Sequence, residues 1–89
     1  MYVEVEKMRK EIMKDILDWM RISRDHAILK DDEAMAKKLS DLILLIGISY
    51  DEVSICRLME NALEEIEEAD YLRREAGKIR PLLFRLELN

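Results

Sequence analysis

The residue types that most often carry out chemistry are scarce in this chain, which has one histidine and one cysteine among its 89 residues. A metal centre would need several His, Cys or acidic ligands at a fixed spacing, and no second histidine exists to complete one. No glycine-rich phosphate loop is present, and no Ser or Cys lies beside His26 in the sequence to act as a nucleophile. We therefore expect no catalytic residue, no metal and no cofactor, and we expect Cys56 to behave as a small core residue.

Charged residues are segregated along the second half of the sequence. Residues 60–70 hold six acids and no base, and the bases follow after residue 71. The two groups form complementary patches, which are Glu60, Glu64, Glu65, Glu67, Glu68 and Asp70 on the acidic side and Arg73, Arg74 and Lys78 on the basic side. The formal net charge of −5 argues against a protein that coats nucleic acid non-specifically, because such binding depends on many Lys and Arg side chains.

The composition indicates an all-α fold with a single domain over residues 1–89. Hydrophobic residues make up 49% and charged residues 39%, with two Gly and one Pro. A chain of this size buries only about 60–65% of its unfolded surface, which favours oligomerisation. The single cysteine and the absence of an apolar run of about 20 residues predict a cytoplasmic protein outside the membrane. Gln and Thr are absent, whereas Ile, Glu, Lys and Arg are abundant, a bias typical of thermophiles.

Apolar periodicity predicts three long helices, at about 5–28, 32–46 and 50–76, packed as a bundle. The acids at 31–33 can cap the second helix. Between the second and third helices we expect a helical hairpin at Gly47–Ser49. In this hairpin Gly47 takes the left-handed conformation that ends a helix, and Ser49 forms a capping box with Glu52.

The two ends of the chain are less clearly patterned. Gly77 is the expected stop of the third helix, and Pro81 starts a short tail in which apolar and polar residues alternate. The opening residues Y-V-E-V-E alternate in the same way, so the two ends can pair as a strand ribbon. A short fourth helix is the alternative for the tail.

Several apolar side chains exceed what one helical hairpin can cover. Leu44 and Leu45 fall off the apolar face of the second helix, and the third helix carries an apolar seam at near-heptad spacing. The expected oligomer interface consists of Leu44, Leu45, Ile55, Met59, Ala62, Ile66 and Ala69. We expect a homodimer in which two copies of the third helix pack antiparallel, so that the acidic patch of one copy meets the basic patch of the other.

The segment from residue 24 to about 66 resembles the ribbon-helix-helix DNA-binding fold, in which a short strand precedes two helices joined by a G-x-S-x-x-E turn. This resemblance implies a strand at 24–30 and nucleic-acid contacts from Arg24, His26, Lys30, Ser49 and Tyr50. The core G-I-S-x-x-x-V is also similar to the classical helix-turn-helix. A DNA-binding regulator is therefore the alternative function, although Asp51 and Glu52 stand where phosphate contacts favour neutral or basic groups.

Two enzyme families share smaller features with the chain. Arg21 and His26 have a spacing that resembles the R-x4-x6-H motif of HEPN-type ribonucleases, which implies action on a phosphodiester. The length, the early Arg9 and the corner after Gly47 resemble the small helical chorismate mutases, but Gln is absent from the chain. The function that the sequence favours is that of a non-catalytic protein-protein interaction or regulatory subunit. Its partner is a second copy of the chain or another protein.

Overall fold

The structure, a computed structural model, describes residues 2–88 and consists of four helices in a bundle. The helices are α1 (Tyr2–Leu29), α2 (Glu33–Ile48), α3 (Glu52–Glu67) and α4 (Arg73–Leu88), with a short 3-10 turn η1 (Asp70–Leu72) before α4. No strand occurs among these residues. The predicted all-α class is confirmed, but the expected bundle of three long helices is only partly matched.

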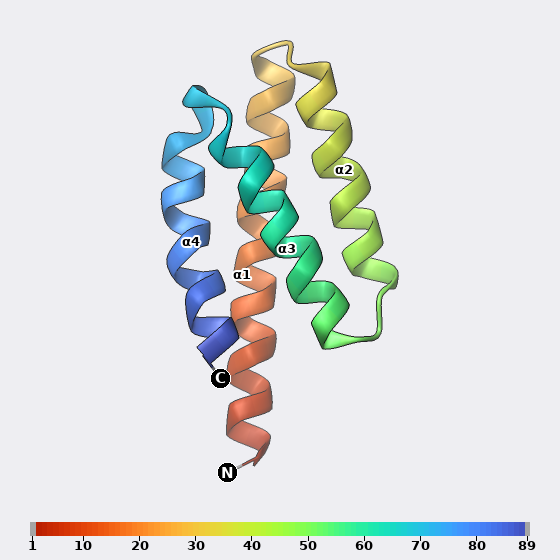
Figure 1. Cartoon of the computed structure of the whole chain (residues 1–89), viewed down its shortest axis with the longest axis vertical. Helices are drawn as coiled ribbons and strands as arrows, with labels where there is room; N and C mark the ends of the chain where they lie inside the picture. The colour runs from red at the N-terminus through yellow and green to blue at the C-terminus, as the bar shows by residue number, and fades with distance from the viewer. Residues whose placement is uncertain (1, 89) are drawn as a thin grey trace.

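The helices run alternately up and down, and each packs against its neighbours in sequence (Figure 1). α1 packs against α2 and α4, and α3 packs against the same two helices, so that α1 and α3 lie across the bundle from each other. The α-carbons have a radius of gyration of 12.9 Å within an envelope of 45 × 24 × 16 Å. The long dimension arises because α1, with 28 residues, extends beyond the other helices at its N-terminal end.

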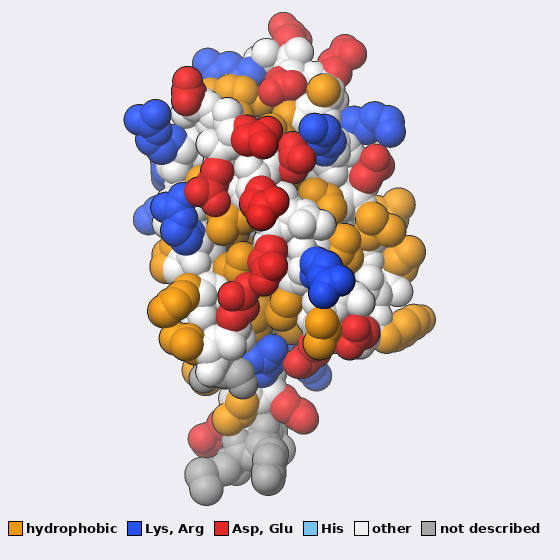
Figure 2. All heavy atoms as spheres, viewed as in Figure 1, with side chains coloured by type: hydrophobic (Ala, Val, Ile, Leu, Met, Phe, Trp, Pro, Cys, Tyr) orange, Lys and Arg blue, Asp and Glu red, His pale blue; other side chains and the backbone are white. Residues whose placement is uncertain are grey.

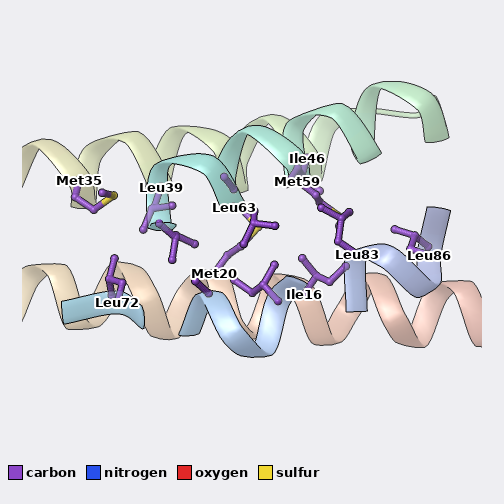
Figure 3. Close-up of a cluster of buried hydrophobic side chains, with 14 of the residues drawn as sticks. Ile16, Met20, Met35, Leu39, Ile46, Met59, Leu63, Leu72, Leu83 and Leu86 are labelled. Carbon is purple, nitrogen blue, oxygen red and sulfur yellow. The ribbon is translucent and has the colours of Figure 1, made fainter. Parts of the chain in front are cut away.

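The core fills the space that the four helices enclose (Figure 3). Ile16 and Met20 of α1 point into the core from one side and Leu39 and Ile46 of α2 from the other, and α4 closes the space with Leu83 and Leu86. Met59 and Ile66 of α3 are also fully buried here. Apolar residues from every helix therefore meet in one continuous core, and this burial is the main source of stability.

The expected third helix at 50–76 is wrong in one respect, because the chain turns back within it. The N–H of Glu68 bonds to the carbonyls of Glu65 and Ile66, and Ala69 has an extended backbone (φ −99°, ψ 119°). The reversal lets α4 run antiparallel to α3, so that Ile79, Leu83 and Leu86 become buried. No Gly or Pro marks this break, and the apolar spacing continues through it, so the sequence pattern alone conceals it.

The expected ends of the chain also differ from the structure. Gly77 lies inside α4 and does not stop a helix, and Pro81 lies inside the same helix and does not start a tail. The strand ribbon is wrong as well, because both the opening residues from 2 onward and the residues up to 88 are helical. The alternative of a fourth helix is correct, and this helix is longer than expected because it completes the core.

The hairpin between α2 and α3 is where the sequence predicts it, but other residues form it. Gly47 is a helical residue of α2, and no described glycine has a positive φ. Among residues 2–88 only Asp31 has a positive φ, at 58°. Ser49 does not cap α3, because its hydroxyl donates to the carbonyl of Leu45 at 2.7 Å. The N-cap of α3 is Asp51, whose carboxylate accepts from the N–H groups of Val53 and Ser54.

Asp32 caps the start of α2, as the acids at 31–33 predict. Its Oδ1 accepts a hydrogen bond from the backbone N–H of Met35 at 3.2 Å. Such a cap satisfies one of the free N–H groups of the first turn. Asp31 before it takes the left-handed conformation, which allows the sharp reversal from α1 to α2.

Candidate functional site

An exposed apolar corner lies where α2 turns into α3. Leu44 is 66% exposed and Tyr50 is 100% exposed. This group, which we call the apolar corner, consists of Leu44, Leu45, Ile48, Tyr50 and Val53. Figure 2 shows hydrophobic side chains gathered along the edge of the molecule over the C-terminal half of α2. Single exposed apolar residues are ordinary, but several of them at one corner of the molecule are typical of an interaction surface.

The structure divides the expected oligomer interface into two groups. Leu44 and Leu45 stay exposed, as their position off the α2 face predicts. In contrast, Met59, Ala62 and Ile66 have no exposed surface, while Ile55 and Ala69 are half-buried against the core. The seam of α3 therefore contacts the other helices of the same chain. The sequence could not distinguish the two groups, because an apolar seam looks the same whether α4 or a second copy covers it.

The complementary charges also meet partly within the chain. Arg80 of α4 forms an ion pair with Glu67, and Lys38 of α2 lies 3.2 Å from Glu65. Arg73 lies 3.8 Å from Asp70, one turn before it. The remaining acids of the patch, Glu60, Glu64 and Glu68, are exposed along α3 and at its end. Figure 2 shows acidic side chains in a row at the centre of this face. Arg74 and Lys78 are exposed on α4.

The expected nucleic-acid contacts do not form one surface. Residues 24–29 belong to α1, so the strand that a ribbon-helix-helix dimer requires is absent from the described chain. Arg24 lies 3.3 Å from Asp25, whereas Ser49 and Tyr50 lie at the opposite end of α2 from Lys30. The expectation of a strand at 24–30 is wrong, because the apolar periodicity of α1 continues through this segment.

The two enzyme resemblances depend on Arg9 and Arg21, and both side chains have partners within the chain. Arg9 donates to the carbonyl of Leu86 at 2.8 Å and lies 3.2 Å from Glu52. It thereby connects α1 with the end of α4 and the start of α3. Arg21 lies 3.2 Å from Asp18 on the same helix.

A polar cluster that sequence reasoning missed lies at the junction of α1, α2 and η1–α4. The Nδ1 of His26 is 2.6 Å from Oε2 of Glu75, whose side chain is only 5% exposed. Next to this pair, the hydroxyl of Tyr71 donates to Oδ2 of Asp32 at 2.6 Å. The rings of His26 and Tyr71 pack edge to face with their centroids 5.3 Å apart. Four residues from two segments that are distant in sequence thus form one connected group.

Two pKa shifts follow from this cluster. Partial burial, together with the hydrogen bond to Asp32, raises the pKa of Tyr71 to about 12. The same bond is the main reason that the pKa of Asp32 is lowered, with the N–H of Met35 as the second cause. Asp32 therefore caps α2 and anchors Tyr71 of η1 with its two oxygens.

The other titratable groups outside this cluster offer little chemistry. Partial burial raises the pKa of the Cys56 thiol, which disfavours the reactive thiolate. Contact with Glu60 raises the pKa of Glu87. Within residues 2–88 no group of three or more His, Cys, Asp or Glu side chains has the geometry to hold a metal ion. None of the described helices is long and apolar enough to span a bilayer.

Comparison with known proteins adds no assignment. No protein-family model matches the chain, and no curated protein or solved structure matches it significantly. The fold defines a four-helix bundle with alternating helix directions, an architecture that hosts many unrelated functions.

Proposed function

We propose that the protein acts without catalysis, as a small interaction module that forms a homodimer through its apolar corner. The observation that carries this proposal is the exposure of Leu44, Leu45, Ile48, Tyr50 and Val53 on one end of the bundle. Exposing a large apolar surface to water is unfavourable, and its burial against a partner supplies the driving force for association.

A second copy of the chain is the partner that this surface fits. The apolar corner itself carries no charge, so two copies related by a two-fold axis bury it without opposing like charges at its centre. Its rim carries both signs, since Asp51 and Glu52 lie beside Val53 and Arg57 follows one turn later. An aromatic residue among aliphatic ones is also the usual composition at the centre of an interface.

The helix pairing of this dimer differs from the one that the sequence favours. Met59, Ala62 and Ile66 already pack inside the chain, so the proposed interface keeps Leu44 and Leu45 and replaces the α3 seam with Ile48, Tyr50 and Val53. The charge patches then have a smaller role in dimerisation, because Glu65 and Glu67 pair with Lys38 and Arg80 of their own chain.

The oligomeric state in solution tests the proposal directly. Size exclusion with light scattering, at protein concentrations from about 1 to about 500 µM, should show a dimer for the wild type. The Leu44→Lys, Leu45→Lys double variant should be monomeric over the whole range, because each lysine places a charge in the apolar interface.

A matched control replaces two exposed apolar residues elsewhere. Phe84 and Leu88 lie on α4 and are 63% and 69% exposed, about as much as Leu44 at 66% and more than Leu45 at 44%. Phe84→Lys with Leu88→Lys should leave the dimer intact. A wild type that stays monomeric at about 500 µM contradicts the proposal, as does a control variant that dissociates as fully as the corner variant.

A further inference from the structure

A second surface feature, separate from the apolar corner, is a cavity, open to solvent, between the C-terminal half of α1 and the η1–α4 junction. Its volume is about 490 Å³, within the range of sites that bind small molecules. Its walls are mainly apolar and aromatic, with Trp19, Ile22 and Leu29 on α1 and Tyr71 on η1. His26 and Arg74 also line it. An apolar cavity with a few polar groups has the composition of a ligand site.

Most charges at this cavity already have a partner. The carboxylate of Asp25 lies 3.3 Å from the guanidinium of Arg24. The carboxylate of Glu75 is bonded to His26. Arg74 is different, because its guanidinium makes no hydrogen bond or ion pair with any residue in the described part of the chain. An Arg side chain is a two-pronged donor that fits a carboxylate or a phosphate.

The ring of His26 presents its second nitrogen, Nε2, at the cavity. Because the carboxylate of Glu75 can only accept, Nδ1 of His26 is assigned as the donor of their bond. Nε2 has no partner among the described residues, and the ring is 34% exposed where it lines the cavity. With Nδ1 as the donor, Nε2 of a neutral imidazole is an acceptor. Glu75 fixes the orientation of the ring, since a buried carboxylate leaves it little freedom.

We infer that this cavity binds a small carboxylate with an aromatic or aliphatic body. The carboxylate lies against Arg74, and the apolar body packs against Trp19, Ile22 and Leu29. This binding is independent of the proposed dimer, because the apolar corner lies at the other end of α2 from the α1–α2 turn. The chain contains a single tryptophan, so Trp19 reports on this cavity alone.

The test uses phenylacetate as probe and the indole N–H resonance of Trp19 in proton-nitrogen NMR spectra as readout. Phenylacetamide has nearly the same shape without the charge, and phenethylamine carries the opposite charge. Phenylacetate should shift the resonance in a saturable way and bind about tenfold more tightly than phenylacetamide, as expected for a charge-assisted hydrogen bond. Equal or tighter binding of the amide or the amine overturns the inference, as does a resonance that phenylacetate leaves unchanged.

Two neighbouring arginines provide the matched variants. Arg74→Gln should weaken phenylacetate binding about tenfold and leave phenylacetamide binding unchanged. Arg73→Gln removes the same charge one residue earlier in α4, but Arg73 lies by Asp70 and does not line this cavity. It should bind phenylacetate like the wild type. If both variants weaken binding equally, net charge and not the cavity governs the effect, and the inference fails. Melting curves of both variants confirm that each is folded.

Discussion

His26 Nδ1 lies 2.6 Å from Glu75 Oε2, and this contact joins the last turn of α1 to the first turn of α4. The two residues have unequal exposure, since the Glu75 side chain is 5% exposed and the His26 side chain 34%. A buried carboxylate without a partner is costly, whereas a partly exposed imidazole can turn to water. Loss of the histidine should therefore destabilise the fold more than loss of the glutamate's charge.

This asymmetry predicts different costs for two substitutions. His26→Ala should lower the free energy of unfolding by about 2–4 kcal/mol, because it leaves Glu75 buried without its partner. Glu75→Gln should cost only about 1 kcal/mol, because the amide oxygen still accepts from Nδ1. Urea denaturation at neutral pH measures both. The double variant should be more stable than His26→Ala alone, and a double variant that is less stable would contradict this account.

The Tyr71–Asp32 hydrogen bond predicts how stability changes in alkaline solution. Tyr71 has a pKa of about 12 in the folded chain, against an ordinary value of 10.0, so folding holds its proton more tightly. The resulting stabilisation is complete below pH 10 and is lost as the pH rises toward 12. The advantage of the wild type over Tyr71→Phe in melting temperature should therefore shrink across this window. An advantage that stays constant to pH 12 would show that the hydroxyl does not titrate as described.

Tyr71→Phe should also change the pKa of Asp32, which titrates in acid. The hydroxyl of Tyr71 lowers the pKa of Asp32 below its ordinary 3.8, so this stabilisation is present above that pH and is lost as the pH falls further. NMR titration of the Asp32 carboxyl should show a higher pKa in Tyr71→Phe than in the wild type. The N–H of Met35 remains as a donor, so the pKa should not rise fully to the ordinary value.

Glu87 and Glu60 predict a stabilising substitution. Contact with Glu60 raises the pKa of Glu87, so the contact is favourable at low pH and becomes unfavourable as Glu87 ionises. Glu87→Gln should raise the melting temperature at pH 7 and have less effect near pH 4, close to the ordinary pKa of 4.5. Glu68→Gln removes an exposed charge at the end of α3 and serves as control. A gain for Glu87→Gln that is no larger than the control's would rule out a specific contact.

Pro81 predicts a second stabilising change, in α4. Proline has no backbone N–H, so the carbonyl four residues earlier, that of Gly77, lacks its usual helical partner. Pro81→Ala should increase the free energy of unfolding by about 1–3 kcal/mol, because the side chain is exposed and the helical bond is restored. Gly77→Ala should add about 0.5–1 kcal/mol, since nothing lies within 4 Å of the new Cβ. Chemical denaturation measures both, and a loss of stability in Pro81→Ala would mean that the proline stabilises the turn of α4.

The sequence by itself determined the helical class, the course of α1 and α2, and the position of the hairpin after Gly47. These features depend on local spacing, because apolar residues at helical intervals form a stripe whatever the rest of the chain does. The exposure of Leu44 and Leu45 also follows from their angular position on α2. Asp51, which caps α3, stands in the printed sequence as a strong capping residue, but Ser49 competes with it for this role.

Only the tertiary structure decided what covers the apolar seam of α3 and which polar groups meet. The break at residues 68–72 carries no Gly or Pro, and it forms because α4 buries more apolar surface by folding back than by continuing outward. His26 and Glu75 are 49 positions apart, and no local pattern relates them. Their contact, and the cavity beside it, exist because the turn before α4 places the start of that helix against the end of α1.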